Sequence, residues 1–141
     1  MFNYSKRINR ELENDDITQI SSSIKRKIRY KNDIIDIELS NKYPFDPPNK
    51  IYINNKLIDY NYNIDNDVKY ILEKYYDITC FCCKSLMCKK NWKPTNTIMD
   101  ILKENENNMI LIEKIKKFLL ITNLHNNKLP IDIYPLLLNY M

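Results

Sequence analysis

The chain contains no glycine, and alanine is also absent from its 141 residues. Glycine supplies the positive φ angles and the close backbone approaches that several ligand-binding loops require. A Walker phosphate-binding loop, a dinucleotide-binding fingerprint, a nucleophile elbow and a kinase glycine-rich loop are therefore all excluded. Any tight turn with a positive φ must instead use Asn or Asp, which tolerate the left-handed conformation better than the remaining residue types.

The chain also lacks long apolar segments and a strong excess of one charge. Residues 1–16 contain no apolar core of a secretory signal, and charged side chains interrupt the most apolar late stretch, residues 109–121. The formal net charge is only +4, whereas nucleic-acid-binding domains usually carry a stronger, one-sided excess. We therefore expect a cytoplasmic protein that binds neither membranes nor nucleic acid. The abundance of Asn, Ile, Lys and Tyr indicates an AT-rich genome.

All four cysteines lie between Cys80 and Cys88. Cysteines this close together do not link distant segments, so they form a poor disulfide framework and indicate an intracellular, reducing setting. There they are thiols, catalytic groups or metal ligands. Zinc commonly takes two Cys-x-x-Cys pairs, whereas this cluster offers one, Cys80 with Cys83, and His125 is a more distant candidate ligand. No metal and no cofactor is assigned from this pattern.

Hydrophobic periodicity predicts one α+β domain over residues 1–141. The expected order is an N-terminal helix, a small antiparallel β-meander, a cysteine loop and C-terminal helices packed on one face of the sheet. Helices are expected at residues 5–14 and 67–76 and from residue 97 onward, with a break or kink at 105–108 and a last apolar turn within 130–141. Strands are expected at residues 24–31, 35–39, 51–53 and 57–60.

The first two expected strands carry complementary charges. Lys25, Lys27 and Arg29 alternate with a row that is apolar except for Arg26 on one strand, and Asp36 and Glu38 alternate with apolar residues on the next. In an antiparallel hairpin these two rows face each other, and each pair contributes about 0.2–1 kcal/mol. This pairing weakens the case for a nucleic-acid site on the basic row.

Local signals predict the turns and one helix start. Asn32 is expected to stand in for glycine in the first hairpin turn, and Asn54-Asn55 to close a second one. Thr97 with Asp100 is similar to a capping box at the start of a helix. Residues 43–48 contain three prolines within five positions, which predicts a rigid corner outside the sheet.

Three segments, in this order, resemble parts of the ubiquitin-conjugating enzymes. Residues 6–12, Lys-Arg-Ile-Asn-Arg-Glu-Leu, are similar to that family's first helix, whose basic face meets the ubiquitin-activating enzyme. Residues 43–48, Tyr-Pro-Phe-Asp-Pro-Pro, are similar to its Tyr-Pro-Phe-x-Pro-Pro corner after the third strand. Residues 92–98, Trp-Lys-Pro-Thr-Asn-Thr-Ile, are similar to its Trp-x-Pro-x-x-Thr-Ile start of the helix after the active cysteine. The resemblance implies the UBC-like fold in a divergent, shortened member.

The same resemblance implies a thioester relay. The family's catalytic cysteine precedes the Trp, which selects Cys83, nine residues before Trp92, with Cys82 as the alternative. Its thiolate would take ubiquitin or a ubiquitin-like modifier from the activating enzyme, and a lysine amine would then attack the thioester with the help of a ligase. Asn63 occupies the position of the family's oxyanion-stabilising Asn, although the preceding His and Pro of the family motif are absent.

Lys6, Arg7 and Arg10 are expected on the solvent side of the first helix.

Two other functions fit the same sequence. A catalytically inactive member of the fold would bind ubiquitin or a ligase without forming a thioester. A zinc-stabilised adaptor would use its cysteines as metal ligands. The sequence thus leaves three alternatives, an acyltransferase, a binding protein and a zinc-stabilised adaptor.

Overall fold

A computed structural model describes residues 4–12, 17–22 and 25–124 of the chain. The chain divides into two compact units, one made of residues 1–60 and 82–105 and the other of residues 61–81 and 106–141. Helix α4 (Ile98–Leu124) contributes its first part to the first unit and the remainder to the second. The apolar turn expected within residues 130–141 lies outside the described residues. One UBC-like domain over residues 1–141 stays a prediction.

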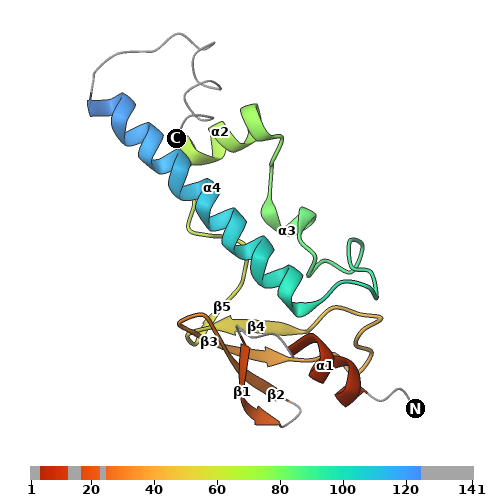
Figure 1. Cartoon of the computed structure of the whole chain (residues 1–141). Coiled ribbons are helices and arrows are strands. Elements are labelled where there is room, and N and C mark those ends of the chain that lie inside the picture. Colours follow the sequence, from red (N-terminus) through yellow and green to blue (C-terminus); the bar gives the residue numbers. More distant parts are fainter. Residues whose placement is uncertain (1–3, 13–16, 23–24, 125–141) are drawn as a thin grey trace. The chain divides into compact units, whose positions relative to one another are not determined.

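The first unit contains an antiparallel sheet whose strands follow one another in chain order, β1-β2-β3-β4-β5 (Figure 1). The strands are β1 (Ile17–Ser22), β2 (Lys25–Tyr30), β3 (Asp33–Glu38), β4 (Lys50–Ile53) and β5 (Lys56–Leu57). The expected α+β class and the meander are therefore confirmed. Periodicity did not predict β1, because an irregularity between Gln19 and Ser21 shifts its register and interrupts the alternation typical of a strand. The last strand is shorter than the expected 57–60.

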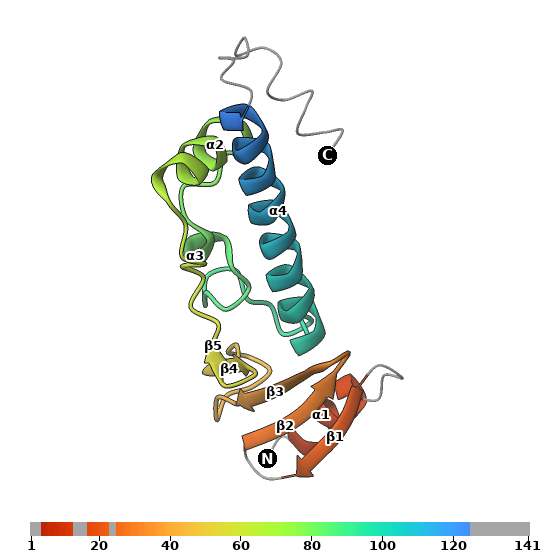
Figure 2. The ribbon, with the colours of Figure 1, turned by 90° about the vertical axis from the view of Figure 1, so that its left-hand side faces the viewer.

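One face of the sheet is apolar and forms the core of the first unit. Its buried side chains come from β2, β3 and β4: Ile28, Tyr30, Ile35, Ile37 and Ile51. Helix α1 (Tyr4–Leu12) adds Ile8, and this helix contacts β1 (Figure 2). The first turns of α4 add Ile98, Ile101 and Leu102 to the same cluster. An antiparallel sheet needs only one covered face, and these two helices supply the cover.

The opposite face of the sheet carries the charged rows that the sequence predicted. Lys25 pairs with Glu38 and Lys27 with Asp36 in the β2–β3 register. Their Nζ atoms lie 3.4 Å and 3.5 Å from the carboxylate oxygens. Because Lys25 is largely exposed and Lys27 is half-exposed, each pair stabilises the sheet by less than about 1 kcal/mol. The expected pairing of the two rows is confirmed.

Turns without glycine place other residues in the left-handed conformation. Asn54 and Asn55 have φ angles of 50° and 67° and lie in the turn between β4 and β5, as expected. The tight turn expected at Lys31-Asn32 is confirmed, but Lys31, with φ 53°, takes the left-handed conformation, so the expectation that Asn32 does so is wrong. Lys31 is the first of the two loop residues, which is the position where a type II′ hairpin needs a positive φ.

Helix α4 begins at the expected cap and does not break. The Thr97 amide donates to Asp100 Oδ2 at 2.8 Å, and the Asp100 amide donates to Thr97 Oγ1 at 3.2 Å, which confirms the capping box. The break or kink expected at residues 105–108 is wrong, because α4 is one helix through this stretch. Asn105 is buried, and Asn108 Nδ2 donates to the Tyr62 hydroxyl at 3.2 Å. Both side chains are thus accommodated without interrupting the helix.

The second unit contains helix α2 (Asn66–Tyr76), which matches the helix expected at residues 67–76. Asp65 caps its start by accepting from the Val68 amide at 2.9 Å, and Asp77 ends it in the left-handed conformation with φ 54°. The apolar residues that this unit buries come from both helices and from the segment after α2: Val68, Ile71, Leu72, Phe81, Ile112, Ile115 and Phe118. The Tyr62 ring meets the Phe81 ring edge-on at 5.1 Å.

Within the first unit, residues 43–48, here called the proline corner, are tied to Trp92. The Tyr43–Pro44 peptide bond is cis, and Tyr43 is fully buried. Trp92 Nε1 donates to the Pro44 carbonyl at 2.8 Å in a buried hydrogen bond. The Tyr43 and Trp92 rings lie 6.0 Å apart between centroids. This contact joins two of the segments that carry the resemblance.

Replacing Trp92 by Phe should lower the free energy of unfolding by about 1–3 kcal/mol. The Pro44 carbonyl then loses its buried donor, and leaving a buried acceptor unsatisfied costs about this much. Urea unfolding followed by circular dichroism measures the change. Tyr70→Phe, at an exposed aromatic of α2, is the control and should stay within about 0.5 kcal/mol of the parent. Equal stability of the Trp92→Phe variant and the parent would contradict the buried contact.

Candidate functional site

The candidate site is the segment of residues 80–91, here called the cysteine loop. Helix α3 (Phe81–Lys84) is a single turn that buries Phe81 and leaves Cys82 and Cys83 exposed. Cys83, the predicted nucleophile, is therefore accessible, and it is a thiol rather than half of a disulfide. Cys88 is also a thiol and is half-buried.

Cys80 and Cys82 are disulfide-bonded. Crowding within one segment led us to expect thiols or metal ligands, and for these two residues that expectation is wrong. The short turn at the start of α3 brings their side chains together, although they cross-link no distant segments. Cys82, the alternative nucleophile, is consequently blocked in this state.

Asn91 holds the backbone on which Cys83 sits. Its Nδ2 donates to the Cys83 carbonyl at 2.7 Å and to the Ser85 carbonyl at 3.0 Å. The Cys88 amide donates to the same Ser85 carbonyl at 3.1 Å, which closes the loop on itself. Because Asn91 directly precedes the buried Trp92, the position of Cys83 is linked to the core of the first unit.

Glu104 ties the middle of the cysteine loop to α4. Its Oε2 accepts from the Leu86 amide at 2.9 Å. Ser85, which is buried, accepts with its hydroxyl from the Met87 amide at 2.9 Å. Burial raises the pKa of Glu104 above its ordinary value, while the hydrogen bonds from Leu86 and Ser85 act in the opposite direction. These two hydrogen bonds thus offset part of the desolvation penalty of the Glu104 carboxylate and fix the cysteine loop against α4.

Helix α1 approaches the segment that follows Trp92 through a nearly buried carboxylate. Glu11 accepts from Arg7 Nε at 2.6 Å and from the Tyr43 hydroxyl at 2.5 Å. It also accepts from the Ile98 amide at 3.3 Å. Arg7 in turn donates to the Pro94 carbonyl at 2.7 Å. All three segments that carry the resemblance therefore meet around Glu11.

The expected solvent-facing basic row of α1 needs one correction. Lys6 and Arg10 are exposed, but Arg7 is only half-exposed because it is the cation that compensates the Glu11 carboxylate. The hydrogen bond to Glu11 raises the pKa of Arg7. Arg7 thus stabilises the nearly buried Glu11 carboxylate, and only Lys6 and Arg10 of the row remain exposed at the surface.

Asn63, the predicted oxyanion donor, is exposed and has a left-handed backbone with φ 51°. Tyr60 and Tyr62 share this conformation, with φ angles of 59° and 50°. Asn63 belongs to the second unit, whereas Cys83 belongs to the first. Its assignment as an oxyanion donor stays a prediction.

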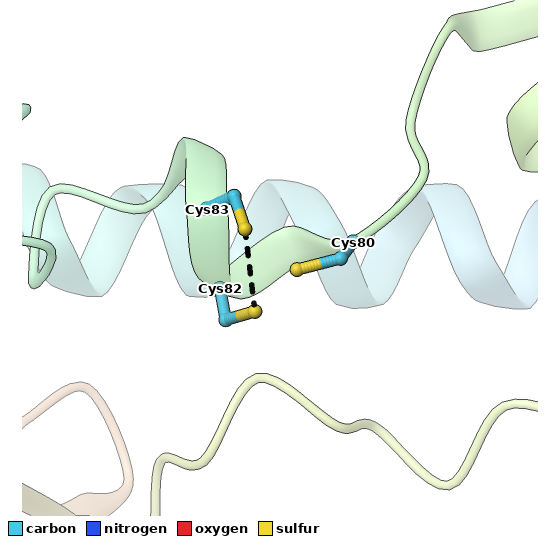
Figure 3. A group of neighbouring side chains, drawn as sticks. All are labelled: Cys80, Cys82 and Cys83. Carbon is cyan, nitrogen blue, oxygen red and sulfur yellow. Dashed lines mark hydrogen bonds between the residues drawn. The ribbon is translucent and has the colours of Figure 1, made fainter.

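Among the described residues, one group of three side chains could hold a metal ion once the Cys80–Cys82 disulfide is reduced. The sulfur atoms of Cys80, Cys82 and Cys83 all lie within 4.8 Å of one another (Figure 3). Cys88 is not a member of this group, and His125 lies outside the described residues. In the described part of the chain, no helix combines the length and the apolar character needed to cross a bilayer.

Glu11, Asn91 and Glu104 are the site residues that sequence reasoning missed. Each acts through a hydrogen bond to the backbone of another segment or turn. Glu11 lies inside one of the segments that resemble the family, and Asn91 lies beside another. This position was the only sequence signal that could have pointed to the two residues. Nothing in the local pattern distinguishes Glu104 from a surface residue of an amphipathic helix.

Comparison with protein-family models, with curated proteins and with solved structures gives no match for this chain.

Glu104→Gln should alter how stability depends on pH. A carboxyl with a raised pKa holds its proton more tightly in the folded chain, so it favours folding below about pH 4.5 and this contribution is lost as the pH rises through the folded pKa. The Glu104→Gln variant has no carboxyl at this position, so its stability does not fall in this way as the pH rises. Its stability relative to the parent should therefore increase between about pH 4 and about pH 7, as measured by urea unfolding at each pH.

Glu73→Gln, at an exposed position of α2, serves as the control for removing one negative charge. Its stability difference from the parent should change less across the same range. If Glu104→Gln loses stability relative to the parent as the pH rises, the desolvated carboxyl is not the dominant effect.

Proposed function

We propose that the chain is a ubiquitin-conjugating-type protein, which accepts ubiquitin or a ubiquitin-like modifier as a thioester on Cys83 and passes it to a lysine amine. The observation that carries the proposal is the exposed Cys83 thiol, whose backbone carbonyl Asn91 holds at 2.7 Å. An acyl acceptor must be open to a large donor and still be fixed in place. Cys83 meets both requirements.

The chemistry follows from the properties of a thiol. The Cys83 thiolate attacks the thioester carbonyl of the loaded activating enzyme, whose cysteine leaves as a thiolate. A substrate lysine then attacks the new thioester, Cys83 leaves as a thiolate, and the amine gives up a proton as the amide bond forms. Both steps need access to Cys83 from solvent, which its exposure provides.

Contacts among the three resembling segments support a UBC-like arrangement of the first unit. Arg7 of α1 reaches the Pro94 carbonyl, Tyr43 of the proline corner reaches Glu11, and Trp92 reaches the Pro44 carbonyl. Segments that were matched separately along the sequence thus contact one another directly. The expected partners are the modifier, its activating enzyme and a ubiquitin ligase, and the proposed location is the cytoplasm.

The exposed Lys6 and Arg10 leave a basic surface on α1 that suits an acidic partner. In the family that the chain resembles, the corresponding face meets the activating enzyme. This surface supports the same partner here. A catalytically inactive member of the fold would keep such a surface without thiol chemistry. The next experiment distinguishes it from a protein that forms a thioester.

Incubation of the reduced protein with ubiquitin, activating enzyme and ATP should give an adduct that reductant removes. Cys83→Ala should abolish the adduct, and Cys83→Ser should convert it to an ester that resists reductant, because the serine oxygen replaces the sulfur. Non-reducing gels and intact-mass spectrometry distinguish the two products. Cys88→Ser, in the same loop, is the matched control and should leave the adduct unchanged.

Loss of the adduct in Cys82→Ala with retention in Cys83→Ala would move the site by one residue. Absence of any adduct from the parent, together with retained binding of ubiquitin or a ligase, would favour the inactive variant of the fold.

Asn63→Gly should slow transfer of the modifier from Cys83 to lysine by about 10²–10³-fold, since one oxyanion donor elsewhere is worth this much. Glycine adopts the left-handed backbone at this position without strain, so only the amide is lost. Single-turnover discharge to free lysine measures the rate. Thioester formation should be unaffected.

Asn55→Gly is the matched control, because Asn55 is also an exposed asparagine with a positive φ. Its discharge rate should equal that of the parent. Equal rates in Asn63→Gly and the parent would remove Asn63 from the proposed mechanism and leave the assignment of Cys83 intact.

A further inference from the structure

The cysteine loop gathers more sulfur atoms than a thioester relay uses. Cys80, Cys82 and Cys83 fall within four consecutive positions, so the local backbone sets the proximity of their side chains. Their sulfur atoms lie within 4.8 Å of one another, and those of Cys82 and Cys83 are 3.9 Å apart (Figure 3). We propose that, once the Cys80–Cys82 disulfide is reduced, these three sulfur atoms bind one soft divalent cation of the Zn²⁺ type.

The spacing of the sulfur atoms fits tetrahedral thiolate coordination. Zn–S bonds of about 2.3 Å at tetrahedral angles place two sulfur ligands about 3.8 Å apart. The Cys82 and Cys83 sulfur atoms already have this separation, and the widest separation within the group exceeds it by about 1 Å. The Cys80 and Cys82 sulfur atoms, which are bonded at about 2 Å, must move apart once the disulfide is reduced. Rotation of the three side chains is the movement that would bring the sulfur atoms around one ion.

Exposure determines the kind of site. Cys82 and Cys83 are exposed and Cys80 is half-buried, so an ion reaches the sulfur atoms directly from solvent. Three protein ligands leave the fourth tetrahedral position to water or to an incoming group. Zinc sites that close with four protein ligands stabilise a fold, whereas sites with an open position exchange ligands. The geometry points to an exchangeable ion rather than a structural one.

Formation of the site requires a reductant. A dithiol reductant supplies two electrons to the Cys80–Cys82 bond, closes to its own cyclic disulfide and transfers its two thiol protons to the released sulfur atoms. Binding of the cation then displaces the thiol protons to the buffer. The oxidised chain has only Cys83 of the three available as a thiolate, so it should bind the cation far more weakly.

One consequence rests on the proposed function. Cys83 belongs both to the metal group and to the thioester site. A sulfur lone pair that coordinates a cation is a poorer nucleophile toward a carbonyl carbon. Bound cation and thioester formation should therefore exclude each other, so in the reduced loop the Cys83 thiol is available only when no metal is bound.

Titration of the reduced full chain with Co²⁺, a spectroscopic substitute for Zn²⁺, tests the site. We expect one Co²⁺ per chain with thiolate-to-cobalt charge-transfer absorption, and loss of that absorption when one equivalent of Zn²⁺ is added. The chain with its disulfide intact should show no such absorption. Absence of the charge-transfer band from the reduced chain would overturn the proposal.

Cysteine-to-serine variants assign the ligands. Cys80→Ser, Cys82→Ser and Cys83→Ser should each weaken Zn²⁺ binding by at least about 100-fold, since loss of a partner outside the coordination shell already costs about 10–100-fold. Cys88→Ser is the matched control, because Cys88 lies in the same loop but outside the group, and it should bind Zn²⁺ as the parent does. Retained affinity in the first three variants, or equal loss in Cys88→Ser, would overturn the assignment.

Alkylation measures the competition at Cys83 without any modifier present. One equivalent of Zn²⁺ should slow iodoacetamide labelling of Cys83 at least about tenfold and leave Cys88 labelling unchanged, as read by peptide mass spectrometry. Unchanged labelling of Cys83 would contradict its role as a ligand. In the thioester assay, one equivalent of Zn²⁺ should suppress the adduct and a chelator should restore it.

The two proposals fail in different ways. A chain that binds Co²⁺ and Zn²⁺ as expected but forms no thioester keeps the metal site and loses the proposed function. If the thioester forms equally well when Zn²⁺ is bound, metal binding and thioester formation at Cys83 do not exclude each other, and that consequence is wrong.

Discussion

A buried hydrogen bond, from the Trp92 indole to the Pro44 carbonyl, anchors the end of the cysteine loop in the fold. It joins segments 48 residues apart in the chain. A buried carbonyl without a donor is costly, so the proline corner and Trp92 stabilise each other's positions. Asn91, the residue before Trp92, carries the hydrogen bonds that hold Cys83. The accessible thiol is thus held by Asn91, whose neighbour Trp92 is fixed by an interaction in the interior.

Glu11 supplies the second constraint on the same region. Removing a carboxylate from water is unfavourable unless charge and hydrogen bonds compensate it, and here Arg7, Tyr43 and the Ile98 amide provide both. Burial, followed by the hydrogen bond to Glu11, raises the pKa of Tyr43, so its hydroxyl stays a donor across the physiological range. One carboxylate therefore fixes α1, the proline corner and the start of α4. The cysteine loop lies between the last two of these segments in the sequence.

Much of the fold could be predicted from the sequence because its signals are local. The basic row of Lys25, Lys27 and Arg29 at every second position identified β2 and its charge pairs, and Thr97 with Asp100 identified the start of α4. The failures also have physical causes. The register shift in β1 removed its periodicity, and a stretch rich in Asn did not break α4 because Asn108 finds a hydrogen-bond partner in Tyr62. In the site, Cys83 is exposed, as its predicted role requires, whereas Asn91 and Glu104 act on backbone groups of the cysteine loop, and of these two only Asn91 lies beside a segment that resembles the family.

Hydrogen exchange at the Trp92 indole tests the central claim most directly. The chain contains one Trp, so a single indole N–H signal in the NMR spectrum reports on this bond without assignment of the rest of the spectrum. The account predicts that this proton exchanges only as the first unit unfolds, with protection that approaches the free energy of unfolding measured by denaturant. Exchange as fast as that of a solvent-exposed indole would contradict it, because the proline corner and the cysteine loop would then not be joined through the core.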